Sequence, residues 1–429
     1  MRYSRLTNQL YIQNRKDFVA AMIPSAVAIF YSNDIMPISA DSTMPFQQAR
    51  DIFYLSGVDQ EESILVLFPD SFQSNHKEIL FLKETNEKIA IWEGAKLDKD
   101  GAFAVSGIRT VYWLHEFDRV IKTLMAEANV LYLNSNEHTR ASLEVETREA
   151  RMNKEFRVKY PYHQVERSAP IMHRLRSVKK EEEMEQMQIA SNITKDGFNR
   201  LLKYIKPGVK EYEIEAELIH EFVRQGSRGF AYTPIVASGK NACVLHYIEN
   251  DSVCKDGEVI LMDVAAEYGN YASDMTRCVP VNGRFTKRQK EVYNAVYRVM
   301  QEAMTLLRPG VFMHEYHKQV GELMTKELLD LQLISRHDIE KQDPNWPAYK
   351  KYFMHGTSHF IGLDTHDVGL WHEPVQAGNA FTVEPGIYIL EEGLGIRLEN
   401  DIIIQENGVL DLMKDIPLEA DHIEDLMNS

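Results

Sequence analysis

The alternation of apolar and polar positions predicts a sheet covered by helices in the first part of the chain. Apolar runs at 64–69 (ILVLFP), 78–82 (EILFL) and 130–133 (VLYL) are typical of buried strands. Residues 117–128 (FDRVIKTLMAEA) instead have the apolar spacing of a helix. Strands mixed with helices in this way indicate an α/β domain with a mixed sheet.

A change of composition marks the end of this part. Residues 176–187 (RSVKKEEEMEQM) form a charged run that leads into a long helical pattern. We place the domain boundary just before it, which predicts domains at 1–173 and 174–429.

The second part contains an internal repeat. Segments 203–223 (KYIKPGVKEYEIEAELIHEFV) and 306–325 (LLRPGVFMHEYHKQVGELMT) each show a helix, a basic-Pro-Gly-Val turn and a second amphipathic helix. Helices usually stop at such a proline-glycine pair. Each segment is followed by a β-rich stretch with two acids, at 257–281 and at 379–404. We therefore expect two α+β halves packed about a pseudo-two-fold axis.

The first β-rich stretch holds Asp263 and Asp274 on either side of a turn-like EYGN. Side chains alternate across a strand, so parity decides whether the two acids share a face. A two-residue loop at Tyr268 and Gly269 puts Asp263 opposite Asp274. A loop at Gly269 and Asn270 displaces Asp263 by two positions and leaves both acids on one face.

The second stretch holds Glu384 and Glu399. An even loop centred on Glu391 and Glu392 places these two acids opposite each other. An odd loop without a bulge would break the argument. With apolar neighbours on every side, four carboxylates are expected to meet in one partly buried patch.

Four buried carboxylates cannot all stay ionised without compensation. Either some hold protons or cations neutralise them, and two divalent ions would supply four positive charges. Oxygen ligands with one imidazole suit manganese, cobalt, iron or zinc better than a thiolate site does. The alternative is that these acids stand at strand ends and face the solvent.

Histidines gather between the two stretches. Residues 354–374 (MHGTSHFIGLDTHDVGLWHEP) contain four of them, and a fifth, His246, precedes the first hairpin. The four are His355, His359, His366 and His372. Their spacing alone does not say which one binds a metal.

These motifs resemble those of a known family. HGTSHFIGLDTHDVG, followed by TVEPGIY and RLEN, is similar to the signature of bacterial Xaa-Pro aminopeptidases (aminopeptidase P), which are proline-specific "pita-bread" metallopeptidases. The likeness extends to SADSTMPFQQARDIFYLSGVDQEESILVLFP and IWEGAKL, so it covers nearly the whole chain. It implies an N-terminal aminopeptidase P-type domain for oligomerisation and substrate access, followed by a pita-bread catalytic domain.

The resemblance also implies site residues. It makes Asp263, Asp274, His359, Glu384 and Glu399 the ligands of two divalent ions, with Mn²⁺ favoured. It places His246, His355 and His366 around the substrate and gives Arg397 the role of orienting a ligand carboxylate.

The implied reaction is hydrolysis of the bond between an N-terminal residue and a following proline. A hydroxide that bridges the metals would attack the carbonyl, with Glu384 as general acid/base. Trp92, in IWEGAKL, is a candidate wall of a neighbouring subunit's site, although an ordinary buried indole is at least as good an interpretation. A homodimer or homotetramer is expected from the resemblance alone.

Composition limits which binding partners and which cellular compartment are expected for this chain. The 429-residue chain carries a formal charge of -16, which argues against nucleic acid and anionic membrane surfaces as partners. No apolar stretch approaches membrane-spanning length. The three cysteines, Cys243, Cys254 and Cys278, suggest a reducing compartment, so we expect a cytoplasmic protein.

Four other functions compete with this one. A prolidase would use the same site on dipeptides only, and a methionine aminopeptidase would lack the N-terminal domain. A non-enzymatic binding module would have lost its metals, against five intact ligands. A cysteine hydrolase built on Cys243 and His246 is a weak idea, because residues three apart on a strand point to opposite faces.

Overall fold

Two compact units make up the chain in a computed structural model that describes residues 2–141 and 144–429. One unit is Arg5–Arg176, and the other combines Met1–Ser4 with Ser177–Ser429. The predicted limits, 1–173 and 174–429, differ from this division by three residues and by the short N-terminal segment. That segment joins the second unit because the Tyr3 ring lies 6.3 Å from the Tyr268 ring and the Ser4 N–H donates to the Tyr268 hydroxyl.

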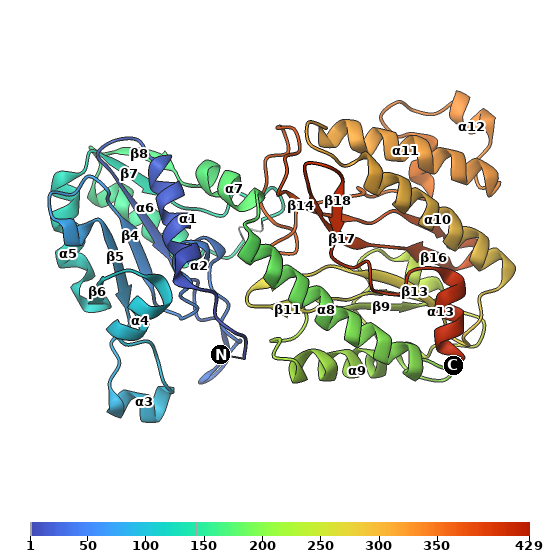
Figure 1. Cartoon of the computed structure of the whole chain (residues 1–429), viewed down its shortest axis with the longest axis horizontal. Helices are drawn as coiled ribbons and strands as arrows, with labels where there is room; N and C mark the ends of the chain where they lie inside the picture. The colour runs from blue at the N-terminus through green and yellow to red at the C-terminus, as the bar shows by residue number, and fades with distance from the viewer. Residues whose placement is uncertain (1, 142–143) are drawn as a thin grey trace. The chain divides into compact units, whose positions relative to one another are not determined.

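The unit Arg5–Arg176 is built on a six-stranded mixed sheet in the order β6-β5-β4-β1-β7-β8 (Figure 1). The β1/β7, β7/β8 and β5/β6 pairs are parallel, and β1/β4 and β4/β5 are antiparallel. The strands are β1 Ala26–Tyr31, β4 Ile64–Leu67, β5 Glu78–Leu82, β6 Thr110–Trp113, β7 Val130–Leu133 and β8 Gln164–Arg167, with a separate hairpin of β2 Pro37–Ser39 and β3 Ser42–Thr43. The predicted strands at 78–82 and 130–133 are confirmed, and the one predicted at 64–69 is present but ends at Leu67.

Helices cover both faces of this sheet. Alternate residues of β1, such as Val27 and Ile29, pack against the apolar stripe of α5 Phe117–Glu127, which confirms the predicted helix. On the opposite face, Phe30 stacks edge-on against Phe18 of α1. The helices are α1 Asn8–Ala20, α2 Arg50–Ser56, α3 Glu87–Glu93, α4 Lys99–Ser106, α5, α6 Arg148–Lys159 and α7 Ala169–Ser177.

The second unit repeats one arrangement twice. Its first half has two long helices and a three-stranded sheet in the order β13-β10-β9, and its second half has two long helices and a sheet in the order β14-β17-β18. The strands are β9 Ile235–Ser238, β10 Val259–Asp263, β11 Glu267–Tyr268, β12 Tyr271–Ala272, β13 Thr276–Pro280, β14 Ala380–Val383, β15 Gly386–Ile389, β16 Leu394–Arg397, β17 Asn400–Ile404 and β18 Val409–Asp411.

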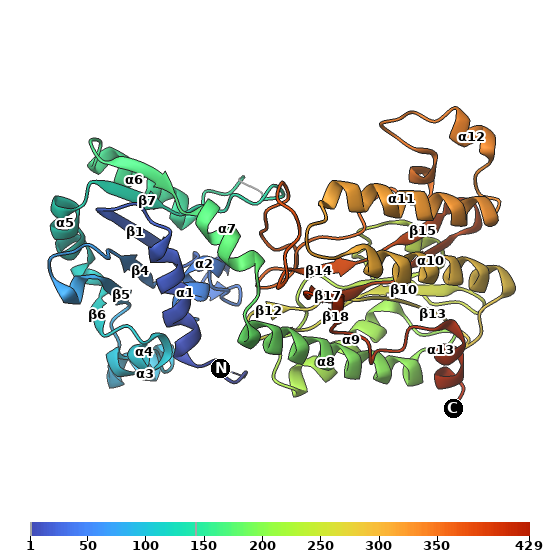
Figure 2. The same cartoon turned by 45° about the horizontal axis from the view of Figure 1, so that its top comes forward.

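The long helices lie on the two sides of these strands (Figures 1 and 2). Those of the first half, α8 Glu181–Tyr204 and α9 Glu211–Arg224, flank the predicted Pro-Gly turn. Those of the second half, α10 Lys287–Leu306 and α11 Met313–Asp330, flank the equivalent turn. The two short helices are α12 Arg336–Glu340 and α13 Ala420–Met427. None of the helices in the described ranges has both the length and the apolar character that crossing a bilayer requires.

The strand registers confirm the parity argument for both hairpins. Tyr268 pairs with Tyr271, so the first loop is Gly269 and Asn270, and Asp263 pairs with Thr276, two positions from Asp274. In the second hairpin Val383 pairs with Asn400 and Gly386 with Arg397. The same register places Glu384 opposite Glu399.

Candidate metal and active site

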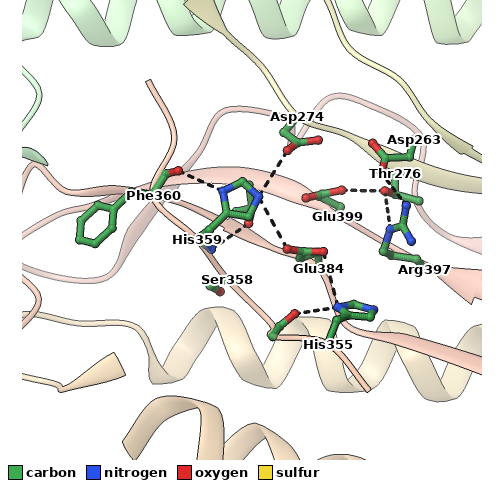
Figure 3. Close-up of polar contacts among 12 residues, drawn as sticks. Asp263, Asp274, Thr276, His355, Ser358, His359, Phe360, Glu384, Arg397 and Glu399 are labelled. Carbon is green, nitrogen blue, oxygen red and sulfur yellow. Dashed lines mark hydrogen bonds and ion pairs between the residues drawn. The ribbon is translucent and has the colours of Figure 1, made fainter. Parts of the chain in front are cut away.

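Three potential ligands from distant parts of the second unit meet in one place. Atoms of Asp274, His359 and Glu399 all lie within 4.8 Å of one another, and the three residues are buried. The His359 Nε2 atom lies 3.5 Å from the Asp274 carboxylate. Figure 3 shows the imidazole and the two carboxylates pointing toward one another.

The backbone around His359 sets the direction of its ring. Its N–H donates to the Thr382 hydroxyl, and Thr382 returns a hydrogen bond to the His359 carbonyl. The ring Nδ1 lies 3.0 Å from the Phe360 carbonyl, so Nδ1 carries the proton and Nε2 faces the acids. This is the orientation that a metal-ligating histidine adopts.

Glu384 stands at the corner between β14 and β15, opposite Glu399. One carboxylate oxygen lies 3.7 Å from His359 Nε2 and the other lies 3.7 Å from His355 Nδ1. Burial, opposed by His359 and Arg397, raises the pKa of Glu384 to about 7. This carboxylate therefore links the cluster to His355.

Asp263 is held by two donors at the other side of the cluster. Arg397 Nη2 and the Tyr232 hydroxyl each lie 2.5 Å from one of its oxygens. Burial raises the pKa of Asp263, the Arg397 charge opposes that rise, and Asp274 adds to it. The arginine fixes the carboxylate and partly balances its charge.

Glu399 is linked to Arg397 through the Thr276 hydroxyl. The Thr276 hydroxyl donates to Glu399 over 2.6 Å and accepts from Arg397 Nε over 2.9 Å. Burial, reinforced by the neighbouring carboxylates Asp274 and Glu384, holds the pKa of Glu399 well above its usual range.

The other predicted histidines surround this cluster at different depths. His355 Nε2 lies 2.8 Å from the Tyr388 hydroxyl, and burial lowers the pKa of His355 to about 3, so its ring is neutral. The exposed His366 ring lies 4.4 Å from the His359 ring, edge to face. His246 is exposed and close enough for its charge to act on His355. His372 is exposed beside Glu373, at a distance of 4.0 Å.

The structure does not favour a thiol nucleophile at Cys243, which ends a 3-10 helix, Gly239–Cys243, and does not lie on the expected strand. Burial raises the pKa of Cys243, which keeps the thiol protonated. The three cysteines are all free.

Comparison with known proteins covers nearly the whole chain. Residues 185–406 match metallopeptidase family M24, and residues 11–132 match the aminopeptidase P N-terminal domain. The chain belongs to metallopeptidase family M24.

Full-length relatives within the M24 metallopeptidases are similar in sequence and in structure. The Xaa-Pro aminopeptidase of Escherichia coli (strain K12) is 33% identical, with 99% of this chain and 98% of that protein covered. The Xaa-Pro aminopeptidase of Haemophilus influenzae is 32% identical over the same shares. The solved proline aminopeptidase P II from Yersinia pestis has a TM-score of 0.88, 31% identity, and 99% and 100% of the two chains covered.

Solved forms of Escherichia coli aminopeptidase P include a zinc-substituted enzyme with product and an enzyme with the inhibitor Pro-Leu. Each has a TM-score of 0.87 and 32% identity and covers 99% of both chains. As an M24 member with these neighbours, the chain is a metallo-aminopeptidase with a pita-bread catalytic unit that uses divalent ions.

The residues of this M24 chain fit such ions. The donor set consists of carboxylate oxygens and one imidazole nitrogen, which suit hard or borderline divalent cations. The carboxylates of Asp263, Glu384 and Glu399 all have raised pKa values because burial penalises their charges and neighbouring acids repel them. A cation among them would remove that penalty.

Sequence reasoning missed four polar residues around this M24 site. Thr276 could have been found, because the register argument places it opposite Asp263. Tyr388 is four residues after Glu384, an even spacing that marks one face of a strand. Tyr232 and the buried Asp401, which accepts from the Asp274 N–H, carry no signal of this kind.

Proposed function

We propose that this chain is an Xaa-Pro aminopeptidase, which hydrolyses the bond between an N-terminal residue and a following proline. The observation that carries the proposal is the full-length similarity to proteins of that name, together with the Asp274, His359 and Glu399 cluster. Because the similarity includes the N-terminal domain, it favours this activity over the dipeptidase activity of a prolidase.

We propose that two divalent ions bind to Asp263, Asp274, His359, Glu384 and Glu399, and that Mn²⁺ is the native ion. Support comes from the two carboxylates that each hairpin contributes and from the imidazole between them. When bound, such ions would polarise the substrate carbonyl and lower the pKa of water. Co²⁺, Fe²⁺ and Zn²⁺ remain compatible with these donors.

We assign proton transfer to Glu384. Its two carboxylate oxygens face different partners, His359 and His355, so it can accept a proton on one side of the cluster and release it on the other. The leaving proline nitrogen needs a proton, because it would otherwise depart as a strongly basic amide anion.

The remaining side chains orient the reactants. The exposed His366 and His246 form a rim that can hydrogen-bond the substrate carbonyl and its developing negative charge. The neutral His355 lies beside the cluster, with its ring nitrogens on the Gly356 carbonyl and the Tyr388 hydroxyl. Arg397 keeps Asp263 in place through the ion pair at 2.5 Å. Its other two hydrogen bonds, to Thr276 and Tyr388, fix the guanidinium plane.

A substrate series tests the proposed function. After addition of Mn²⁺, the protein is expected to cleave Xaa-Pro-Yaa tripeptides and to leave Xaa-Ala-Yaa tripeptides intact. Hydrolysis of Xaa-Pro dipeptides alone would make the chain a prolidase. Turnover of neither class would reject the proposal.

Assembly and location are further parts of this proposal. Helix α3 buries none of its residues, and the Ile91 and Trp92 side chains on it are 79% and 89% exposed. Such an apolar surface supports a homodimer or homotetramer, which sedimentation velocity would detect. Three free cysteines support a cytoplasmic location.

A further inference from the structure

The loop that carries His246 is only partly anchored in the hydrophobic core, through Ala242, Tyr247 and Cys254. It joins β9 to β10, and three of its side chains, Val244, His246 and Ile248, are exposed. A cavity of about 520 Å³ lies against both ends of the loop, lined there by Ser238, Gly239, Lys240, Asn241, Ser252 and Val253. His246 itself lies outside the core, so polar contacts contribute to holding this part of the loop in place.

One buried carboxylate supplies these contacts. Glu211, at the first position of α9, is 0% exposed and accepts five hydrogen bonds from the loop. Its Oε1 accepts from the Ser238 N–H and hydroxyl, each at 2.7 Å, and from Asn241 Nδ2 at 3.3 Å. Its Oε2 accepts from the Tyr247 hydroxyl at 2.8 Å and from the Ser252 N–H at 2.9 Å.

These donors bracket His246 along the chain. Ser238 and Asn241 precede it, Ser252 follows it, and Tyr247 is its immediate neighbour. The Glu211 N–H also donates to the Ser252 carbonyl. A single side chain thus ties the start, the middle and the end of the loop to one helix end.

The five donors are neutral, and the negative charge of the Glu211 carboxylate is also stabilised by the helix end at which it lies. Glu211 lies at the N-terminus of a 14-residue helix, where the helix dipole favours a negative charge. Hydrogen bonds to a charged acceptor are about twice as strong as neutral ones. A neutral amide at this position would keep the shape of the side chain but present N–H groups to some of these donors.

The loop is also placed directly against the site. Gly395 of β16 packs so closely on Ala242 that a Cβ atom there would lie 2.2 Å from the Ala242 carbonyl oxygen. The same strand ends at Arg397, which holds Asp263. A displacement of the loop would therefore move His246 relative to His355 and Arg397.

We propose that Glu211 is a positioning residue that holds His246 at the rim of the substrate site. This inference rests on the proposed function, in which His246 contacts the substrate. Within residues 2–141 and 144–429, the hydrogen bonds of the Glu211 carboxylate go to Ser238, Asn241, Tyr247 and Ser252 and to none of the five proposed metal ligands, so its effect passes through the loop.

Hydrogen exchange on the metal-free protein tests the positioning itself. Glu211→Gln is expected to speed amide exchange in peptides covering 238–252 by about tenfold or more, while β10 and β14 keep their protection. The matched control is Glu221→Gln, a buried carboxylate on the same helix whose partners, Arg224 and Gln225, lie outside the loop. Unchanged exchange in the loop would overturn the proposal.

A double-mutant cycle tests the consequence for catalysis. Glu211→Gln is expected to lower kcat/KM for a proline tripeptide by about 10- to 100-fold. In a His246→Ala background the same change should lower it by less than about threefold, because the side chain that Glu211 positions is gone. A full effect in that background would overturn the inference and leave the proposed function standing.

Tyr247→Phe covers the case in which Glu211→Gln does not fold. It removes one donor to Glu211 and is expected to show the same dependence on His246 with a smaller loss of kcat/KM. If Tyr247→Phe lowers kcat/KM by the same factor with and without His246→Ala, the result would count against the proposal. If the wild-type protein cleaves no proline peptide, the proposed function fails, and the exchange experiment still decides whether Glu211 orders the loop.

Discussion

Single side chains in this site have more than one partner, and Arg397 shows why that matters. Its three nitrogen groups contact Asp263, Thr276 and Tyr388, and Tyr388 in turn contacts His355. The guanidinium therefore connects an acid of the first hairpin to a histidine beside the cluster. The resemblance gave Arg397 the role of orienting a ligand carboxylate but could not reveal Tyr388 as the link, because that contact depends on packing between strands.

Replacing Glu384 tests the proposed proton carrier. Glu384→Gln keeps the size of the side chain and removes its ability to take a proton, so kcat/KM for a proline tripeptide is expected to fall by about 1,000-fold. Circular dichroism should show an unchanged fold. The control is Glu391→Gln, because the Glu391 side chain is 64% exposed at the tip of the same hairpin. Near-wild-type turnover of Glu384→Gln would contradict the mechanism.

Glu149 in the N-terminal unit makes stability depend on pH. Burial and the nearby Asp51 raise the pKa of Glu149 to about 7, and Asn134 Nδ2 donates to both carboxylates. In the window from pH 4.5 to 7 the folded state binds more protons than the unfolded state, so this carboxyl makes stability fall as pH rises.

Glu149→Gln removes that dependence. The variant is expected to melt about 2–4 °C above the wild type at pH 8, with a smaller difference at pH 5, where the wild-type carboxyl is already protonated. Scanning calorimetry at the two pH values measures this. The control is Glu155→Gln, at an exposed position of the same helix. An equal gain at both pH values would show that the effect is not one of charge.

At the scale of elements, the two hairpins were largely predictable and their junction was not. Alternation along each strand is a local property, so the shared faces of Asp263 with Asp274 and of Glu384 with Glu399 followed from counting residues. Among the contacts between the two hairpins are those of a fully buried arginine, Arg277, that the sequence did not distinguish from a surface cation. Its guanidinium donates to the carbonyls of Glu399, Thr276 and Pro417 and to the Asn400 side chain.

Arg277→Lys tests this junction. Lysine keeps the charge but cannot reach four acceptors in one plane, so the free energy of unfolding is expected to fall by about 2–4 kcal/mol. Urea unfolding followed by tryptophan fluorescence measures the loss. Arg284→Lys is the matched control, because the Arg284 side chain is 59% exposed. Equal stability of the two variants would show that the buried network contributes little.

At the scale of the whole molecule, the repeat and the resemblance together anticipated two domains and a duplicated catalytic unit. The N-terminal residues Tyr3 and Ser4 escaped prediction, because their contacts with Tyr268 join positions more than 260 residues apart. The predicted strands and helices depended on local periodicity, whereas such distant contacts leave no periodic trace. The histidines around the site are a different case, since their spacing left their roles open and only the resemblance assigned them.

Metal removal should affect the two units differently. Ions held at 100 times their dissociation constant would stabilise the folded catalytic unit by about 2.7 kcal/mol. After treatment with a chelator, hydrogen exchange is expected to accelerate in peptides containing β10, β13 and β14, and re-addition of Mn²⁺ should reverse the change. Peptides from β1 and β4 are the internal control. Faster exchange in both units to the same extent would argue against a localised metal site.

The division of the acids between two halves also has a consequence during synthesis on the ribosome. Asp263 and Glu399 are separated by 136 residues (399 − 263). At a translation rate of about 5–20 residues per second, the second acid is made roughly 7–27 s after the first. Throughout that interval the nascent chain has only part of the proposed donor set, so binding of two ions by that set could begin only after both hairpins are complete.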